Sequence, residues 1–134
     1  MAFDLLWYAT GRDAFAATAG HLVAAGVITG PIAALFSWID WAGLPLGTRA
    51  RRLGLLHGLG NMAVVALFAV SLLLRLEGWA WDPEPLVLSL AGAGIAVVTA
   101  WVGGELVERL GVAVHGDAYL DAPSCLSTLG GRGG

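Results

Sequence analysis

The segment RARRLGLLHGLGNMAVVALFAVSLLL (residues 49–74) is the strongest indication of how this chain folds, because an arginine cluster leads directly into a long apolar run. The run from Leu53 to Leu74 contains no charged side chain. A hydrocarbon core about 30 Å thick needs roughly 20 apolar residues, and only a helix can cross it alone with its own backbone hydrogen bonds satisfied. The segment therefore predicts a transmembrane helix that follows a basic loop.

Two further apolar runs, Ala14 to Ile39 and Leu86 to Val102, flank this segment. Hydrophobic residues make up 57% of the chain and charged residues 13%, whereas a soluble domain carries about 25% charged residues. We therefore expect an all-α membrane protein with three transmembrane helices. The expected spans are residues 14–39, 53–76 and 86–110, within a transmembrane domain of residues 1–114 that precedes a flexible C-terminal tail, residues 115–134.

Composition and motifs argue against several classes of function. The net charge of −3 is too small to indicate a nucleic-acid partner, and the single cysteine, Cys125, excludes an intramolecular disulfide and a cysteine metal cluster. The sequence has no glycine-rich phosphate loop, no His-Glu-x-x-His and no Gly-x-Ser-x-Gly motif. We therefore expect a protein without catalytic residues and without a metal site.

The arginines predict the orientation of the chain. Arg49, Arg51 and Arg52 lie in the short connection between the first two spans. Arginines concentrate in the cytoplasmic loops of membrane proteins. We therefore expect this connection and the C-terminus to be cytoplasmic, and the N-terminus to lie outside.

Polar side chains near the cytoplasmic ends of the spans form one candidate site, because such side chains are costly inside a membrane. His57 and Asn61 are one helical turn apart and share a face. We expect them to lie at the depth of a polar cluster of arginines and carboxylates, namely Asp40, Arg49, Arg51, Arg52, Glu105 and Glu108. Two interpretations remain open: ion pairs that hold the loop at the interface, or a site for a proton, an ion or a quinone headgroup.

The histidines suggest a cofactor site as a second hypothesis. His21 lies in the outer part of the first span and His57 near the inner end of the second, about 14 Å apart along the membrane normal. Two axial ligands of one haem must face each other at one height, so these two do not hold a haem together. The candidate cofactor-binding residues remain His57, His21 and Asn61, with lipid, pigment, quinone or haem as candidate ligands at a protein interface. For His21 alone, the alternative is a buried histidine bonded to a neighbouring carbonyl.

Small residues spaced four apart indicate close helix packing, because helices associate in lipid where their backbones can approach closely. Two such ridges occur, in the first and third spans: Gly26 and Gly30, and Gly92, Ala96, Ala100 and Gly104. They indicate either packing within the bundle or docking onto another membrane protein.

Two motifs carry a resemblance to a known family. The first is Gly47-Thr48-Arg49-Ala50-Arg51-Arg52, which leads into His57 and Asn61. The second is Trp101-Val102-Gly103-Gly104-Glu105-Leu106-Val107 followed by Gly111-Val112. From about Phe3 to Val114 the chain resembles the domain-of-unknown-function 2231 family of bacterial four-helix membrane proteins, which has no established activity.

The resemblance implies a four-helix bundle that lacks most of its first helix. Phe3 to Tyr8 resembles the end of that helix, but the His-Pro and His-Phe-Pro elements that begin it in the family are missing. The family also implies a multi-pass protein of the bacterial inner membrane. Some members are similar to, or fused with, Rieske or cytochrome c modules, which implies a link to membrane electron transfer.

These observations favour a small integral membrane accessory or structural subunit, packed against a larger respiratory or photosynthetic complex. Its expected partners are membrane lipid and other membrane-protein subunits. The alternative hypothesis is a redox-linked membrane protein that binds haem, quinone or pigment. A transporter is less favoured, because no span has a continuous polar face.

Overall fold

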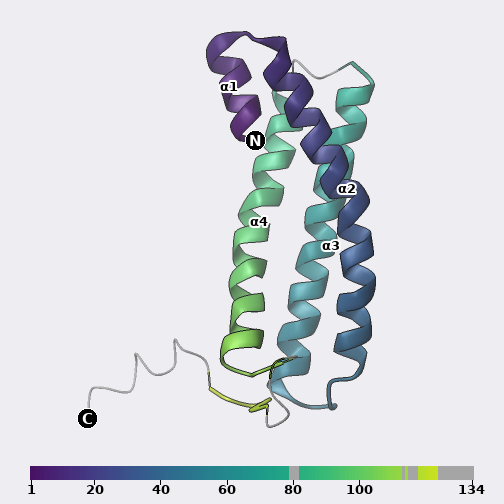
Figure 1. Ribbon diagram of the computed structural model, residues 1–134, viewed down its shortest axis with the longest axis vertical. Helices are drawn as coiled ribbons and strands as arrows, with labels where there is room; N and C mark the ends of the chain where they lie inside the picture. The colour runs from purple at the N-terminus through teal and green to yellow at the C-terminus, as the bar shows by residue number, and fades with distance from the viewer. Residues whose placement is uncertain (79–81, 113, 115–117, 124–134) are drawn as a thin grey trace, which may run out of the picture.

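The computed structural model of the chain, shown in Figure 1, describes residues 1–78, 82–112, 114 and 118–123. In these ranges the chain forms helices and no strands, which confirms the expected all-α fold. The helices are α1 (Ala2–Thr10), α2 (Asp13–Ala42), α3 (Arg49–Leu76) and α4 (Pro83–Glu108). Three of them, α2, α3 and α4, are long and apolar enough to cross a membrane, as predicted.

Local sequence explains where the long helices begin. At the start of α3, the side chain of Thr48 accepts a hydrogen bond from the backbone N–H of Arg51 at 3.3 Å. This cap lets the helix begin at Arg49, ahead of the apolar run, because it satisfies one of the free N–H groups of the first turn. Helix α4 begins at Pro83, a residue suited to the first helical position since it has no N–H to leave unpaired.

Helix α3 is the centre of the bundle, with α2 and α4 packed against it (Figure 1). Glycines allow both contacts. A Cβ added to Gly30 of α2 would lie 2.9 Å from Val65, and one added to buried Gly92 of α4 would lie 3.4 Å from the ring of Phe68. The two predicted ridges therefore contribute to packing within the bundle.

The short helix α1 turns back along α2 (Figure 1). It ends at Thr10 and is capped by Gly11, whose φ of 65° lies in the left-handed region that favours glycine. The N–H of Gly11 donates to the carbonyl of Trp7 at 2.7 Å. The turn after α1 and the end of α3 lie at one end of the bundle, here called the Asp4 end. The start of α3 and the end of α4 lie at the other, the Arg49 end.

Part of the segment predicted as a tail packs against the Arg49 end. The backbone N–H of Ala50 donates to the carbonyl of Leu120 at 2.9 Å, and Leu120 and Ala122 contact the buried cluster of Ala50, Leu106 and Leu110. Residues 118–123 therefore belong to the folded domain. The remainder of the predicted tail, residues 115–117 and 124–134, lies outside the described residues.

Candidate functional site

His57 and Asn61 of α3 form a closed polar network with Thr99 of α4. His57 Nδ1 lies 2.8 Å from the carbonyl oxygen of Thr99, and its Nε2 lies 2.9 Å from Asn61 Nδ2. The Thr99 hydroxyl donates to Asn61 Oδ1 at 2.9 Å. Because a carbonyl only accepts, Nδ1 carries the proton and Nε2 accepts from the amide. A neutral imidazole thus satisfies every member of the network.

Two glycines make room for this network between α3 and α4. A Cβ at Gly103 would lie 2.8 Å from the imidazole of His57, and a Cβ at Gly60 would collide with the side chain of Thr99. Sequence reasoning placed His57 and Asn61 on one face but missed Thr99. The available signal was a hydroxyl within an apolar span, where a polar side chain is costly without a partner.

The geometry of His57 bears on the cofactor hypothesis. Both ring nitrogens are engaged by neighbouring protein groups, so a metal or haem would have to displace one of them. Across the described residues there is no group of three or more His, Cys, Asp or Glu side chains that could hold a metal ion. In this structure the network joins α3 to α4 through hydrogen bonds.

Arg49 is the centre of a second polar group, at the Arg49 end. Its guanidinium forms an ion pair with Glu105 at 2.6 Å and donates to the carbonyl of Ala122 at 2.7 Å. Its backbone N–H donates to the carboxylate of Asp121 at 2.7 Å, so Asp121 helps to cap α3 from a distant part of the chain. This group joins the start of α3 and the end of α4 to the C-terminal segment.

The other members of the predicted polar cluster lie apart from this ion pair. Arg51 lies over the ring of Trp41, with its guanidinium carbon 4.3 Å from the ring centroid, and the Trp41 indole N–H donates to the carbonyl of Arg51 at 2.9 Å. Asp40, Arg52 and Glu108 are exposed, and within the described residues their side chains make no ion pair. The structure thus brings together two separate groups, Arg49 with Glu105 and His57 with Asn61. The exposed charges of the predicted cluster belong to neither group, because they lie on outward faces of their helices.

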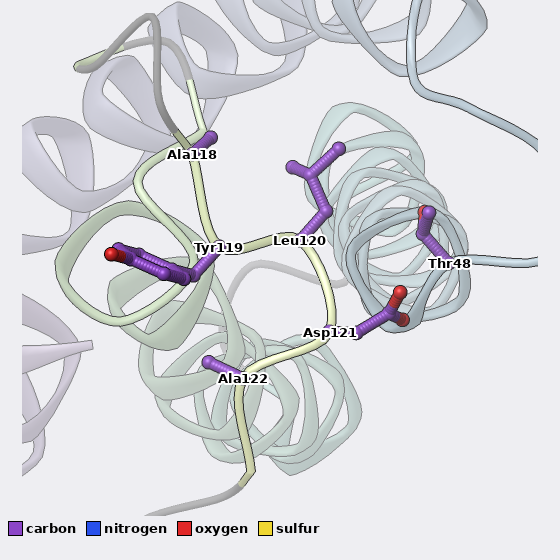
Figure 2. A pocket seen from close by; sticks show the side chains of 6 residues that line it. All are labelled: Thr48, Ala118, Tyr119, Leu120, Asp121 and Ala122. Carbon is purple, nitrogen blue, oxygen red and sulfur yellow. The ribbon is translucent and has the colours of Figure 1, made fainter.

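A hollow of about 500 Å³ lies beside the C-terminal segment (Figure 2). It is lined by Thr48 and by residues 118–122. Figure 2 shows Asp121 directed towards the side of Thr48, with Tyr119 projecting the opposite way; Tyr119 is 78% exposed. The carboxylate in the lining, Asp121, already accepts the bond from the backbone N–H of Arg49 that caps α3.

A third polar group lies at the Asp4 end and was not predicted as a site. Asp4 of α1 and Arg75 of α3 form an ion pair at 2.7 Å, with side chains only 6% and 7% exposed. Arg75 Nε lies 3.4 Å from Ser71 Oγ, which donates to the carbonyl of Pro85 at 2.7 Å and lies 3.0 Å from Ser89 Oγ. The signal for this group was Arg75 at the predicted outer end of a span, where a charged side chain is costly without a partner.

The charges around Asp4 change its protonation equilibrium. Burial by itself would raise the pKa of Asp4, but hydrogen bonds from the terminal amine and from Arg75, together with both positive charges, outweigh it. The pKa of Asp4 is therefore lowered below its ordinary value of 3.8. The second terminal nitrogen of Arg75, Nη2, is buried and has no hydrogen-bond partner within the described residues.

His21 lies on α2 with an exposed side chain, in contrast to the buried, carbonyl-bonded histidine that one interpretation expected. No hydrogen bond joins it to another described residue. It lines a second hollow, of about 480 Å³, together with Arg75. His21 and His57 thus belong to different sites on different helices.

The small-residue ridges divide between inner and outer faces. Gly30 and Gly92 meet neighbouring helices, whereas a Cβ added to Gly26 or Gly104 would meet no atom within 4 Å. Ala96 is half-buried and Ala100 is exposed. The outer members are therefore available to lipid or to another protein.

Three apolar spans joined by short connections define a multi-pass helical membrane protein, in contact with lipid. The chain belongs to the DUF2231 family, described as a predicted membrane protein, whose family model matches residues 1–116. This confirms the resemblance carried by the arginine and Trp101–Val107 motifs. No curated protein and no solved structure matches the chain.

Proposed function

We propose that this chain is a non-catalytic accessory or structural subunit that packs against a larger membrane complex. The observation that supports it is the open face of α4. Gly104 has room for a side chain without contacting any atom within 4 Å, while Val97 and Trp101, on the same side of the helix, are 71% and 54% exposed. A small residue between larger apolar ones allows another helix to approach closely in lipid.

The polar groups support the same proposal. The three polar networks, around His57, Arg49 and Asp4, pair mainly with other groups of the chain and tie its helices to one another. We infer that these networks hold the subunit together rather than act on a substrate. The family's association with Rieske and cytochrome c modules favours a respiratory or photosynthetic complex as the partner.

The orientation forms part of the proposal. Arg49, Arg51, Arg52 and Arg109 all lie at the Arg49 end, whereas Arg12 and Arg75 lie at the Asp4 end. The excess favours a cytoplasmic Arg49 end in a bacterial inner membrane. Cysteine labelling at Gly47 from the cytoplasmic side and at Asp82 from the outside would support this orientation, and the reverse pattern would overturn it.

The test of the subunit proposal is native purification of the full chain with two matched variants. Gly104→Leu places a large side chain on the open face of α4. Ala91→Leu is the control: it places leucine at an exposed small residue of the same helix, 13 residues before Gly104 and therefore about 140° around the helix from it. We expect wild type and Ala91→Leu to elute with the same partner proteins and Gly104→Leu to elute alone.

Two results would contradict the proposal. One is a wild-type chain that purifies without partners in mild detergent and turns over a substrate. The other is a purified chain whose visible spectrum shows stoichiometric haem or pigment, which would favour the redox-linked alternative.

A further inference from the structure

The second hollow lies between α2 and α3 at the Asp4 end and has an unusual lining for a lipid-facing surface. Its volume of about 480 Å³ falls in the range of small-molecule sites. Four small residues of α2, Ala16, Ala17, Gly20 and Ala24, form one wall, and Leu72 and Leu76 belong to the α3 side. An apolar chain can lie against such a surface, because small side chains leave the helix backbone accessible.

Two basic side chains, His21 and Arg75, line the same hollow. Side chains of a helix lean towards its N-terminus, and α2 and α3 run in opposite directions. His21 therefore leans towards the Asp4 end and Arg75 away from it, so the two approach one level. The exposed imidazole of His21 has no hydrogen-bond partner among the described residues. Arg75 Nη2 also has none, but it is buried, so Arg75 acts on the hollow through its positive charge.

A polar side chain at membrane depth is costly without a partner. The guanidinium of Arg75 is already paired with Asp4, so the carboxylate of Asp4 partly neutralises the positive charge that Arg75 presents to the hollow. At its rim lies Asp13, an exposed carboxylate at the first turn of α2. The lining thus combines an apolar wall, the exposed imidazole of His21, the positive charge of Arg75 and the negative charge of Asp13.

We propose that this hollow binds one zwitterionic phospholipid. The phosphate and ester oxygens, which only accept hydrogen bonds, meet His21 and the positive charge of Arg75. The upper part of one acyl chain lies along the wall of small residues, and the ammonium group of the headgroup lies near Asp13. The apolar wall distinguishes a lipid from free phosphate, and Asp13 disfavours an anionic headgroup. This site is independent of the α4 face on which the proposed function rests.

The test is native mass spectrometry of the full chain, purified in detergent and titrated with phosphatidylethanolamine. Gly20→Leu places a large side chain in the wall of the hollow, where an added Cβ meets no atom within 4 Å. Gly26→Leu is the matched control: it is the same change on the same helix, equally free of contacts, and outside the hollow. We expect a one-to-one lipid adduct in wild type and Gly26→Leu, and an adduct weakened about tenfold or more in Gly20→Leu.

Further variants and ligands test the chemistry of the site. His21→Leu should weaken the adduct and His21→Gln, which keeps a donor, should retain it. Phosphatidylglycerol should bind more weakly than phosphatidylethanolamine in wild type, and Asp13→Asn should reduce that difference. Equal binding by Gly20→Leu and Gly26→Leu would overturn the proposal, as would displacement of the lipid by inorganic phosphate alone.

Discussion

The Asp4 end and the Arg49 end each join distant parts of the chain through an arginine and a carboxylate, yet the two pairs lie in different surroundings. At the Arg49 end the guanidinium of Arg49 bonds both Glu105 and the carbonyl of Ala122, and its side chain is 26% exposed. At the Asp4 end the side chains of Asp4 and Arg75 are 6% and 7% exposed, and Arg75 Nη2 has no hydrogen-bond partner within the described residues.

The difference indicates that the two arginines, Arg49 and Arg75, depend to different degrees on their carboxylate partners. An ion pair removed from solvent has no water to replace a lost partner, so its stability depends on the opposing charge. A partly exposed arginine with a second acceptor keeps much of its solvation and one hydrogen bond when the carboxylate is removed. We therefore expect the Asp4 end to be the more sensitive of the two to loss of its carboxylate.

The largest expected effect is that of Asp4→Leu, which leaves the buried Arg75 without its counter-charge. Removing one partner of a buried pair costs about 3–5 kcal/mol of unfolding free energy. Unfolding in a titration with sodium dodecyl sulfate, followed by far-UV circular dichroism, measures the loss. Asp40→Leu, which removes an exposed carboxylate, is the control and should change little. An equal effect of the two variants would show that the buried pair contributes no special stability.

Glu105→Leu should have a smaller effect, about 1–3 kcal/mol, because Arg49 retains the carbonyl of Ala122 and partial exposure. The same titration measures it, with Glu108→Leu one turn further along α4 as the exposed control. A loss larger than that of Asp4→Leu would reverse the comparison between the two ends.

Asp121→Ala tests whether the C-terminal segment contributes to the Arg49 end through its cap on α3. Loss of a capping side chain costs about 0.5–2 kcal/mol. The matched control is Asp82→Ala, because Asp82 precedes α4 at the N-cap position without a side-chain capping bond. Thermal unfolding should therefore shift for Asp121→Ala and stay near wild type for Asp82→Ala. Equal shifts would indicate that the bond between Asp121 and Arg49 does not stabilise the helix.

The smallest expected effect is the part of the pH dependence of stability that arises from Asp4. Since the folded pKa of Asp4 lies below its ordinary value of 3.8, the stabilisation is present above that value and is lost as pH falls through the folded pKa. Between about pH 6 and about pH 3, the unfolding midpoint of wild type should fall more than that of Asp4→Asn. Parallel profiles for the two proteins would exclude Asp4 as the group responsible.

Some features of this protein follow from its sequence alone. The uncharged run from Leu53 to Leu74 predicts a membrane-spanning helix, because a bilayer imposes the same length and backbone requirement on every chain that crosses it. The spacing of His57 and Asn61 places them on one face, because an α-helix has a constant period. Spans and shared faces are local properties, and local sequence is sufficient to predict them.

The choice of partners is decided only by the tertiary structure. Asp4 and Arg75 lie at distant positions in the sequence, as do Arg49 and Asp121, and no helical period relates them. Gly26 and Gly30 have the same residue type and belong to one ridge, yet only Gly30 meets Val65, because α2 and α3 approach each other closely there. Periodicity gives the position of a residue on its own helix, whereas the packing of the helices determines what that residue faces.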